Sequence, residues 1–205
     1  METPEEVELV KAAQRGSQSG LDLCLTGHPE LVLYQDPSGV TLLHWAAINN
    51  HVALVNHIVG LASRQASHRY LDSIGGNLRG TPLHWAVRNG ATEAVVALVE
   101  LGADLTITDS QGLNCLHLAA ASGRHLLVMY LVSKGANINM KDVQTQRTPL
   151  VWASCLPNMK DSSAMVLLKC GADVNIQDVD GRTALHWAVF HVLSNPILSP
   201  PNLSS

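Results

Sequence analysis

Residues 81–87 read TPLHWAV, and four variants of this heptapeptide occur elsewhere in the chain. The copies begin at Thr41, Thr81, Asn114, Thr148 and Thr183, which gives spacings of 40, 33, 34 and 35 residues. A word that returns at a nearly constant period of about 20 to 50 residues indicates a repeat architecture. The chain of 205 residues is therefore expected to be built from stacked units.

Each copy has the residue types that begin a helix. Thr81 and Thr148 can accept hydrogen bonds from first-turn amides, and the proline that follows each of them has no N–H to leave unpaired. The leucine two places on and the alanine three further fall on one helical stripe, which we expect to be the stacking surface. These residues are Leu43, Leu83, Leu116, Leu150 and Leu185, with Ala46, Ala86, Ala119, Ala153 and Ala188.

A second apolar run with the 3.6-residue period follows each of the first four copies. The runs cover residues 52–58, 94–101, 126–132 and 164–168. Three of them end at glycines that can form left-handed helix caps, namely Gly102, Gly135 and Gly171. Turns that begin with aspartate and have glycine fourth, at Asp36, Asp109 and Asp178, precede three of the copies. Helix pairs joined by such fingertip loops are therefore predicted.

The period near 33 and the T-P-L-H-x-A word resemble ankyrin repeats. The resemblance implies an all-α fold, an ankyrin-repeat solenoid of stacked helix-turn-helix units with β-turn fingertip loops. We expect an ankyrin domain over residues 1–190 and an irregular, Pro- and Ser-rich tail over 191–205, where Pro196, Pro200 and Pro201 forbid a regular helix. The predicted divisions are a degenerate cap repeat at 6–36, repeats at about 37–75, 76–109, 110–142 and 143–178, and an incomplete repeat at 179–190.

Composition limits the classes of partner. The net charge of -4 provides no positive field for phosphates, so nucleic acid is not expected as a partner. Four widely spaced cysteines without a CxxC pair, at Cys24, Cys115, Cys155 and Cys170, fit a reducing compartment and are expected to be small core residues. The N-terminus is unlike a secretory signal and no apolar stretch is long enough to span a bilayer. We therefore expect a cytoplasmic location with no membrane insertion by this chain.

The recurring histidines raise the question of a metal site, and the repeat geometry argues against one. Helices of adjacent repeats pack about 8–10 Å apart, whereas zinc requires each nitrogen at about 2.0–2.1 Å. His44, His84, His117 and His186 are instead expected to bond to local backbone or to the threonine of their own repeat. No nucleophile has a base and an orienting group beside it. Catalytic residues, metals and cofactors are therefore all predicted to be absent.

Three segments have a more specific resemblance. VTLLHWAAINN at 40–50, LDSIGGNLRGTPLHWAVRNG at 71–90, and the pairing of TPLVWAS with TALHWAV are similar to the N-terminal ankyrin domain of the huntingtin-interacting, DHHC-type palmitoyltransferases. In that family the domain faces the cytosol from Golgi and vesicle membranes. It recruits substrates through short extended peptides that contain small aliphatic residues and Gln-Pro.

The resemblance implies that Asn49 and Trp85 bind such a peptide, because they match the family's recruiting asparagine and tryptophan. Trp45, Asn50 and His84 are further candidates beside them. About seven residues more than the 33-residue period lie around 62–69, close to the implied groove. The transmembrane helices and the Asp-His-His-Cys domain of the family do not occur in this sequence.

The sequence thus predicts a non-catalytic protein–protein interaction module that acts as a monomer. The leading interpretation is that the chain is the substrate-recruiting part of a palmitoyltransferase-like protein. In this interpretation the catalytic half is missing, because the chain is a fragment or a splice form. A free-standing cytosolic ankyrin adaptor or regulatory scaffold with no acyltransferase link is the alternative. An enzyme is a third reading, which turnover by the purified protein would support.

Overall fold

The structure is a computed structural model that describes residues 3–65, 70–155 and 163–194. Over these residues the chain forms helices and no β-strand. Isolated bridges close two fingertip loops, between Gln35 and Thr41 and between Gly75 and Gly80. The predicted all-α architecture is confirmed. The contacts divide the chain into two compact units, unit 1 at 1–110 and unit 2 at 111–205.

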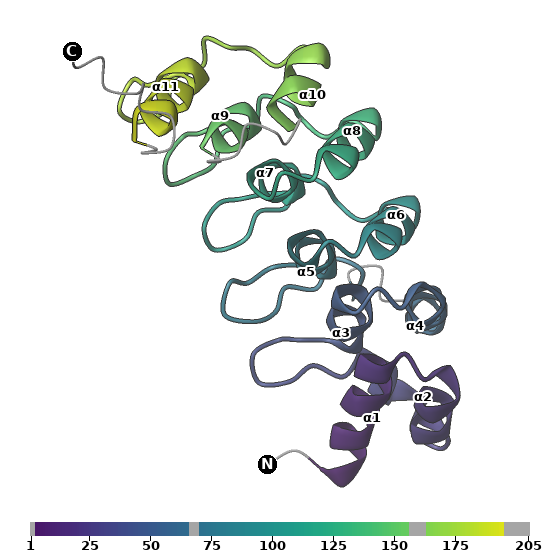
Figure 1. Ribbon diagram of the computed structural model, residues 1–205. Helices are drawn as coiled ribbons and strands as arrows, with labels where there is room; N and C mark the ends of the chain where they lie inside the picture. Colours follow the sequence, from purple (N-terminus) through teal and green to yellow (C-terminus); the bar gives the residue numbers. More distant parts are fainter. Residues whose placement is uncertain (1–2, 66–69, 156–162, 195–205) are drawn as a thin grey trace, which may run out of the picture. The chain divides into compact units, whose positions relative to one another are not determined.

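Unit 1 consists of two rows of helices (Figure 1). The first row is α1 (Pro4–Arg15), α3 (Leu42–Ile48) and α5 (Pro82–Asn89). The second row is α2 (Gln18–Leu25), α4 (Val52–Arg64) and α6 (Thr92–Glu100), with the short 3-10 helix η1 (Pro29–Leu33) before α3. The fingertip loops before α3 and α5 project on the same side of the first row (Figure 1).

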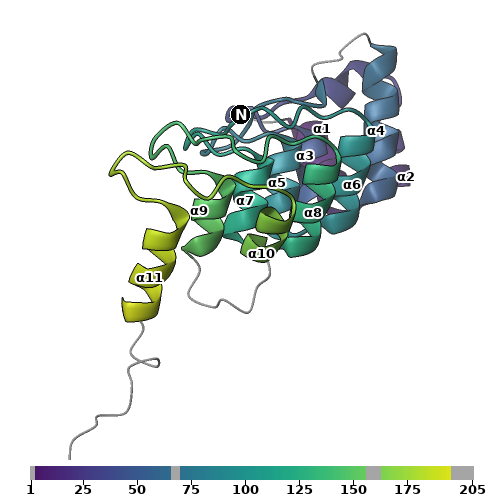
Figure 2. The same ribbon diagram turned by 90° about the horizontal axis from the view of Figure 1, so that it is seen from above.

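Unit 2 repeats this plan (Figures 1 and 2). Its first row is α7 (Cys115–Ala121), α9 (Pro149–Ser154) and α11 (Ala184–Ser194), and its second row is α8 (His125–Ser133) and α10 (Ser163–Lys169). Each α-helix of the first rows of units 1 and 2 contacts its neighbour in the same row. Each second-row helix from α4 to α10 also contacts the first-row helix of its own repeat, so the helix pairs predicted from the second apolar runs are present.

Reciprocal caps explain where the first-row helices begin. The Thr41 hydroxyl accepts a hydrogen bond from the His44 backbone N–H, and the His44 ring accepts one from the Thr41 backbone N–H. Thr81 and His84 form the same pair at α5. Two of the orphan donors at the start of the helix are thereby satisfied, as in the capping box of Thr with Glu. The sequence word thus contains its own helix-start signal.

The predicted stacking stripe is buried in the first four copies. Leu43 and Leu116 are 0% exposed, and so are Ala46 and Ala119. Leu185 in α11 differs, since 71% of it is exposed. α11 packs against α9, and the face that bears Leu185 lies away from that contact.

Three details differ from the sequence-based expectation. α4 continues to Arg64, so the first of the extra residues at 62–69 are helical, while residues 66–69 lie outside the described residues. α11 continues to Ser194, so the irregular tail does not begin at 191, and residues 195–205 with their three prolines are outside the described part. Among the cysteines only Cys115 is buried, and Cys170 is exposed.

Candidate functional site

The histidine of the repeated word links its own repeat to the next one within each unit. His44 is 0% exposed, and its Nδ1 accepts a hydrogen bond from the backbone N–H of Thr41 at 3.1 Å. Its Nε2 lies 3.0 Å from the Gly80 carbonyl oxygen, which can only accept, so Nε2 carries the proton and the ring is neutral. In unit 2, Nε2 of His117 lies 3.2 Å from the Arg147 carbonyl oxygen. The predicted bond to the local threonine is confirmed for His44.

Burial lowers the pKa of His44 to about 4, against the opposing influence of its bond to the Gly80 carbonyl. The unfolded chain protonates this ring near its usual pKa of about 6.5. Between these values the unfolded state binds more protons, so stability is lost as the pH falls from 6.5 toward 4. We expect this group to remove about 2 kcal/mol of unfolding free energy between pH 7.5 and pH 5.

Urea unfolding of the wild type and of His44→Gln at the two pH values measures this contribution. The variant should be less stable at pH 7.5 and should lose less stability on acidification, because glutamine does not titrate. An equally steep loss in both proteins would contradict the assignment of the pH dependence to His44.

The Trp85 pocket lies in unit 1 beside the fingertip loop that precedes α5. It has a volume of about 490 Å³. It is lined by Ile48, Gly76, Asn77, Leu78, Gly80, His84, Trp85 and Arg88. These residues come from the end of α3, the fingertip loop and one face of α5, so the pocket exists only because two successive repeats stack.

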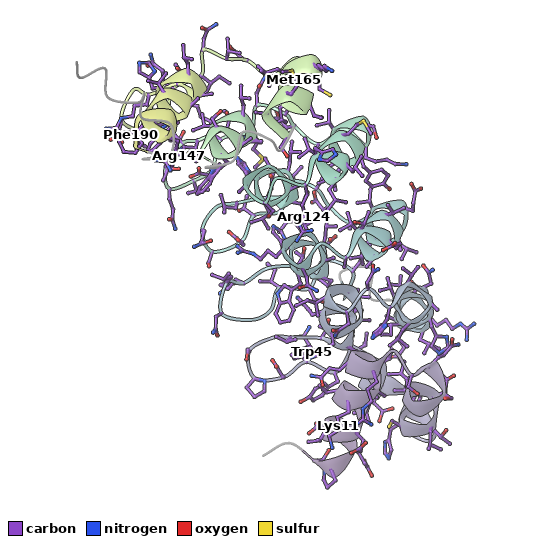
Figure 3. The ribbon with its side chains drawn as sticks, viewed as in Figure 1. Lys11, Trp45, Arg124, Arg147, Met165 and Phe190 are labelled. Carbon is purple, nitrogen blue, oxygen red and sulfur yellow. The ribbon has the colours of Figure 1, made fainter. Side chains whose placement is uncertain are left out.

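The walls of the pocket are fixed by neighbouring contacts. The half-buried Trp85 indole rests on the loop backbone so closely that a Cβ at Gly76 would lie 2.7 Å from its Cζ2. On the other side the Trp45 ring meets the Trp85 ring edge to face, with 5.7 Å between centroids. The Arg88 guanidinium is held by the buried Asp109 carboxylate, with 2.6 Å between Nη2 and Oδ2. The site is thus preformed in the free protein. Figure 3 labels Trp45 with its side chain in place.

The structure brings Trp45, His84 and Trp85 together. Asn49 and Asn50 do not line the pocket, and they have different surroundings. His84 forms part of the pocket wall. It is 1% exposed and is held by its own repeat, with its Nδ1 2.8 Å from the Thr81 hydroxyl. Asn49 follows Ile48 at the end of α3 and is exposed. Its Nδ2 donates to the Trp45 carbonyl at 2.9 Å, while its Oδ1 accepts no hydrogen bond from any residue that the structure describes.

Asn50 has a role within the fold that the sequence did not reveal. Its Oδ1 accepts a hydrogen bond from the backbone N–H of Ala94 at 2.9 Å, and its Nδ2 donates to the Glu93 carboxylate. Ala94 lies in the first turn of α6, whose N-cap residue Ala91 has no side chain that can cap. Asn50 therefore caps the helix of the next repeat, and it has a left-handed φ of 60° that asparagine tolerates.

We expect Asn50→Ala to lower the unfolding free energy by about 1 kcal/mol for the cap and by about 1–2 kcal/mol more for the left-handed backbone. Asn50→Gly is the matched variant, because glycine keeps the backbone conformation and loses only the cap. Denaturant unfolding should rank the wild type above Asn50→Gly, and Asn50→Gly above Asn50→Ala. Equal stability of all three proteins would contradict the capping role.

Sequence reasoning did not identify Ile48, Leu78 and Arg88 as pocket residues. They lie on three separate segments, and a single sequence shows no periodicity that joins them. A signal was present in the loop itself, because glycine stands at its start, whereas the four other fingertip loops begin with Asp36, Asp109, Asp142 and Asp178.

Within residues 3–65, 70–155 and 163–194, no group of three metal-ligating side chains comes together. None of the helices described there combines the length and the apolar character that crossing a membrane requires.

The chain has similarity to named proteins over most of its length. Palmitoyltransferase ZDHHC17 of Danio rerio is 41% identical over 184 residues, which are 89% of this chain and 28% of that protein. Palmitoyltransferase ZDHHC13 of Homo sapiens is 37% identical over 191 residues, which are 92% of this chain and 29% of that protein. Palmitoyltransferase AKR1 of Lachancea kluyveri is 39% identical over 159 residues, which are 75% of this chain and 20% of that protein. The resemblance found in the sequence is thus confirmed, and this chain spans less than a third of each of these relatives.

The repeat assignment has independent support. Residues 9–109, 43–142 and 116–196 each match the family described as ankyrin repeats (3 copies). These ranges overlap and together cover residues 9–196, which include every described helix except the start of α1. The chain belongs to the ankyrin-repeat family.

Proposed function

We propose that this chain is a protein-interaction module that recruits proteins for S-acylation by holding a short extended segment of them at the Trp85 pocket. The observation that carries the proposal is the pocket itself, whose volume of about 490 Å³ is formed by two stacked repeats around an accessible tryptophan. Binding pockets usually combine apolar walls with a few polar groups, and Trp is enriched among the residues that anchor partners. The similarity to palmitoyltransferases supports the link to S-acylation.

The groups around the pocket fit an extended peptide with proline. The indole face of Trp85 offers a flat apolar surface on which a proline ring can pack. Asn49, next to the pocket residue Ile48, has an amide oxygen that accepts no hydrogen bond within the described chain. That oxygen can accept a hydrogen bond from a backbone N–H of the peptide, because an extended peptide leaves its backbone N–H groups unpaired.

Calorimetric titration of the purified chain tests the proposal. The ligand is a peptide with small aliphatic residues followed by Gln-Pro, and the control peptide has Ala-Ala in place of Gln-Pro. We expect about one peptide bound per chain with a Kd in the micromolar range, about -8 kcal/mol, and much weaker binding of the control. Equal binding of both peptides would overturn the proposal. Capture of other proteins that does not depend on Trp85 would favour a free-standing adaptor instead.

A further inference from the structure

The fingertip loop at the Trp85 pocket has the same length as the loop before α9 and is closed by a backbone hydrogen bond at the same place. In the first, the N–H of Gly75 donates to the carbonyl of Gly80 at 2.9 Å, and in the second, Asp142 and Arg147 make the same bond at 2.9 Å. The residue before the last has a positive φ in both loops, of 50° and 55°. The two ends of the loops therefore correspond residue by residue, with glycine at both ends of one loop and charged residues at both ends of the other.

In unit 2 the charged ends of the loops engage the indoles. Trp152 donates its Nε1–H to Asp142 Oδ2 at 2.9 Å, and the Arg147 guanidinium lies 5.7 Å from the centroid of the same ring. Trp187 donates in the same way to Asp178 Oδ2 at 2.9 Å. Figure 3 shows Arg147 beside α9 and α11, where its guanidinium lies 4.0 Å from the Trp187 centroid. These two tryptophans are thus occupied by their own chain.

At Trp85, glycine at both loop ends removes the two contacts that the aspartate and the arginine make with the indole in unit 2. A Cβ at Gly75 would lie 2.5 Å from the Gly39 carbonyl oxygen, so the close approach of the two loops excludes an aspartate there. A Cβ at Gly80 would lie 3.4 Å from Trp85 Cδ1 and 3.6 Å from Nε1, at the edge of the pocket. No described residue accepts a hydrogen bond from Trp85 Nε1. The volume that loop side chains fill in unit 2 is therefore part of the Trp85 pocket.

We propose that Gly80 and Gly75 determine specificity by leaving the indole N–H of Trp85 for a neutral carbonyl oxygen of the bound peptide. This inference rests on the proposed peptide site. The charge at the pocket rim supports a neutral acceptor, because Arg88 lines the pocket and already pairs with the buried Asp109. This ion pair has no net charge, so it does not favour a charged peptide group, and the ring can meet an uncharged segment without displacing any side chain of the chain itself.

Hydrogen exchange of the indole protons tests the first half in the free protein. In NMR spectra of the labelled chain, the Trp85 Hε1 should exchange with solvent about tenfold or more faster than those of Trp152 and Trp187, because the latter are hydrogen-bonded. On saturation with the Gln-Pro peptide, the Trp85 Hε1 should become protected and its resonance should move downfield. The other two should not change.

Substitutions at Gly80 test the second half. Gly80→Arg places the arginine of the unit 2 loops at the equivalent position and should weaken peptide binding by about tenfold or more, with about threefold for Gly80→Ala. Gly60→Ala is the matched control, because Gly60 lies exposed in α4 and a Cβ there meets nothing within 4 Å. It should bind like the wild type. Thermal melts of all variants show that each one is folded.

The outcomes separate the two proposals. If Trp85 Hε1 exchanges as slowly as Trp152 Hε1 in the free protein, the inference is overturned whatever the peptide does. If the wild type and a folded Gly80→Arg bind the peptide equally, the inference is overturned and the proposed function stands. If Trp85 Hε1 exchanges fast and the wild type binds no Gln-Pro peptide, the proposed function is overturned.

Discussion

Replacing Trp85 with alanine is expected to weaken binding of a Gln-Pro peptide by about 30-fold or more, or about 2 kcal/mol, the size typical of a binding hot spot. The reason is the position of the ring, which forms a wall of the Trp85 pocket and lies edge to face with Trp45. Truncation removes the apolar surface and the hydrogen-bond donor together. Calorimetric titration at one pH and salt concentration gives the difference in Kd.

Trp152→Ala is the matched control for this measurement. Trp152 occupies the same place in the repeated word, and its indole is bound to Asp142. We expect its loss to change peptide affinity less than twofold. Both variants remove packing around a half-buried ring, so thermal melts must show that each one is folded at the titration temperature. Equal affinities of the two variants would contradict the assignment of the site to Trp85.

Leu43→Ala should destabilise the chain by about 3 kcal/mol or more, because it deletes a fully buried side chain and leaves a cavity between helices. Leu43 is 0% exposed at the stacking stripe of α3. The surrounding side chains in α1, α3 and α5 can relax only in part, since each is held in its own repeat. The free energy of unfolding in urea is the quantity to compare.

Leu185→Ala provides the control at the equivalent place of the last copy. Because 71% of Leu185 is exposed, its truncation should cost less than about 0.5 kcal/mol. The pair thus changes the same residue type at the same repeat position in two different surroundings. A large loss for Leu185→Ala would mean that its face is covered in solution.

The repeated word predicted the helices because the relevant signals are local. The N-cap of α5 is determined by Thr81, Pro82 and the histidine three residues after the cap, all within one turn. The leucine and alanine stripe also follows from the 3.6-residue period, and it is buried in the first four copies. The end of α4 at Arg64 could not be predicted, because no glycine or proline there interrupts the helix.

The site was predicted only in part, because it depends on contacts between repeats. Trp85 was found through its place in the word and through a family resemblance, whereas Ile48 and Leu78 join the pocket only after α3 and α5 stack. Asn50 was grouped with Asn49 as a binding residue. Its hydrogen bond from the Ala94 N–H compensates for the alanine at the N-cap of α6. The sequence did contain a signal for this role, because Ala91 cannot cap the helix and another residue must do so.

The bonds from His44 and His117 to the following loop end on main-chain oxygens. The Gly80 carbonyl accepts from His44, and the Met140 and Arg147 carbonyls lie within hydrogen-bond distance of His117, although glycine has no side chain and arginine has a long cationic one. Alignment of neighbouring repeats within each unit is therefore insensitive to which amino acid stands at that place. A substitution at this place can therefore cover or uncover the neighbouring tryptophan without changing how the repeats stack.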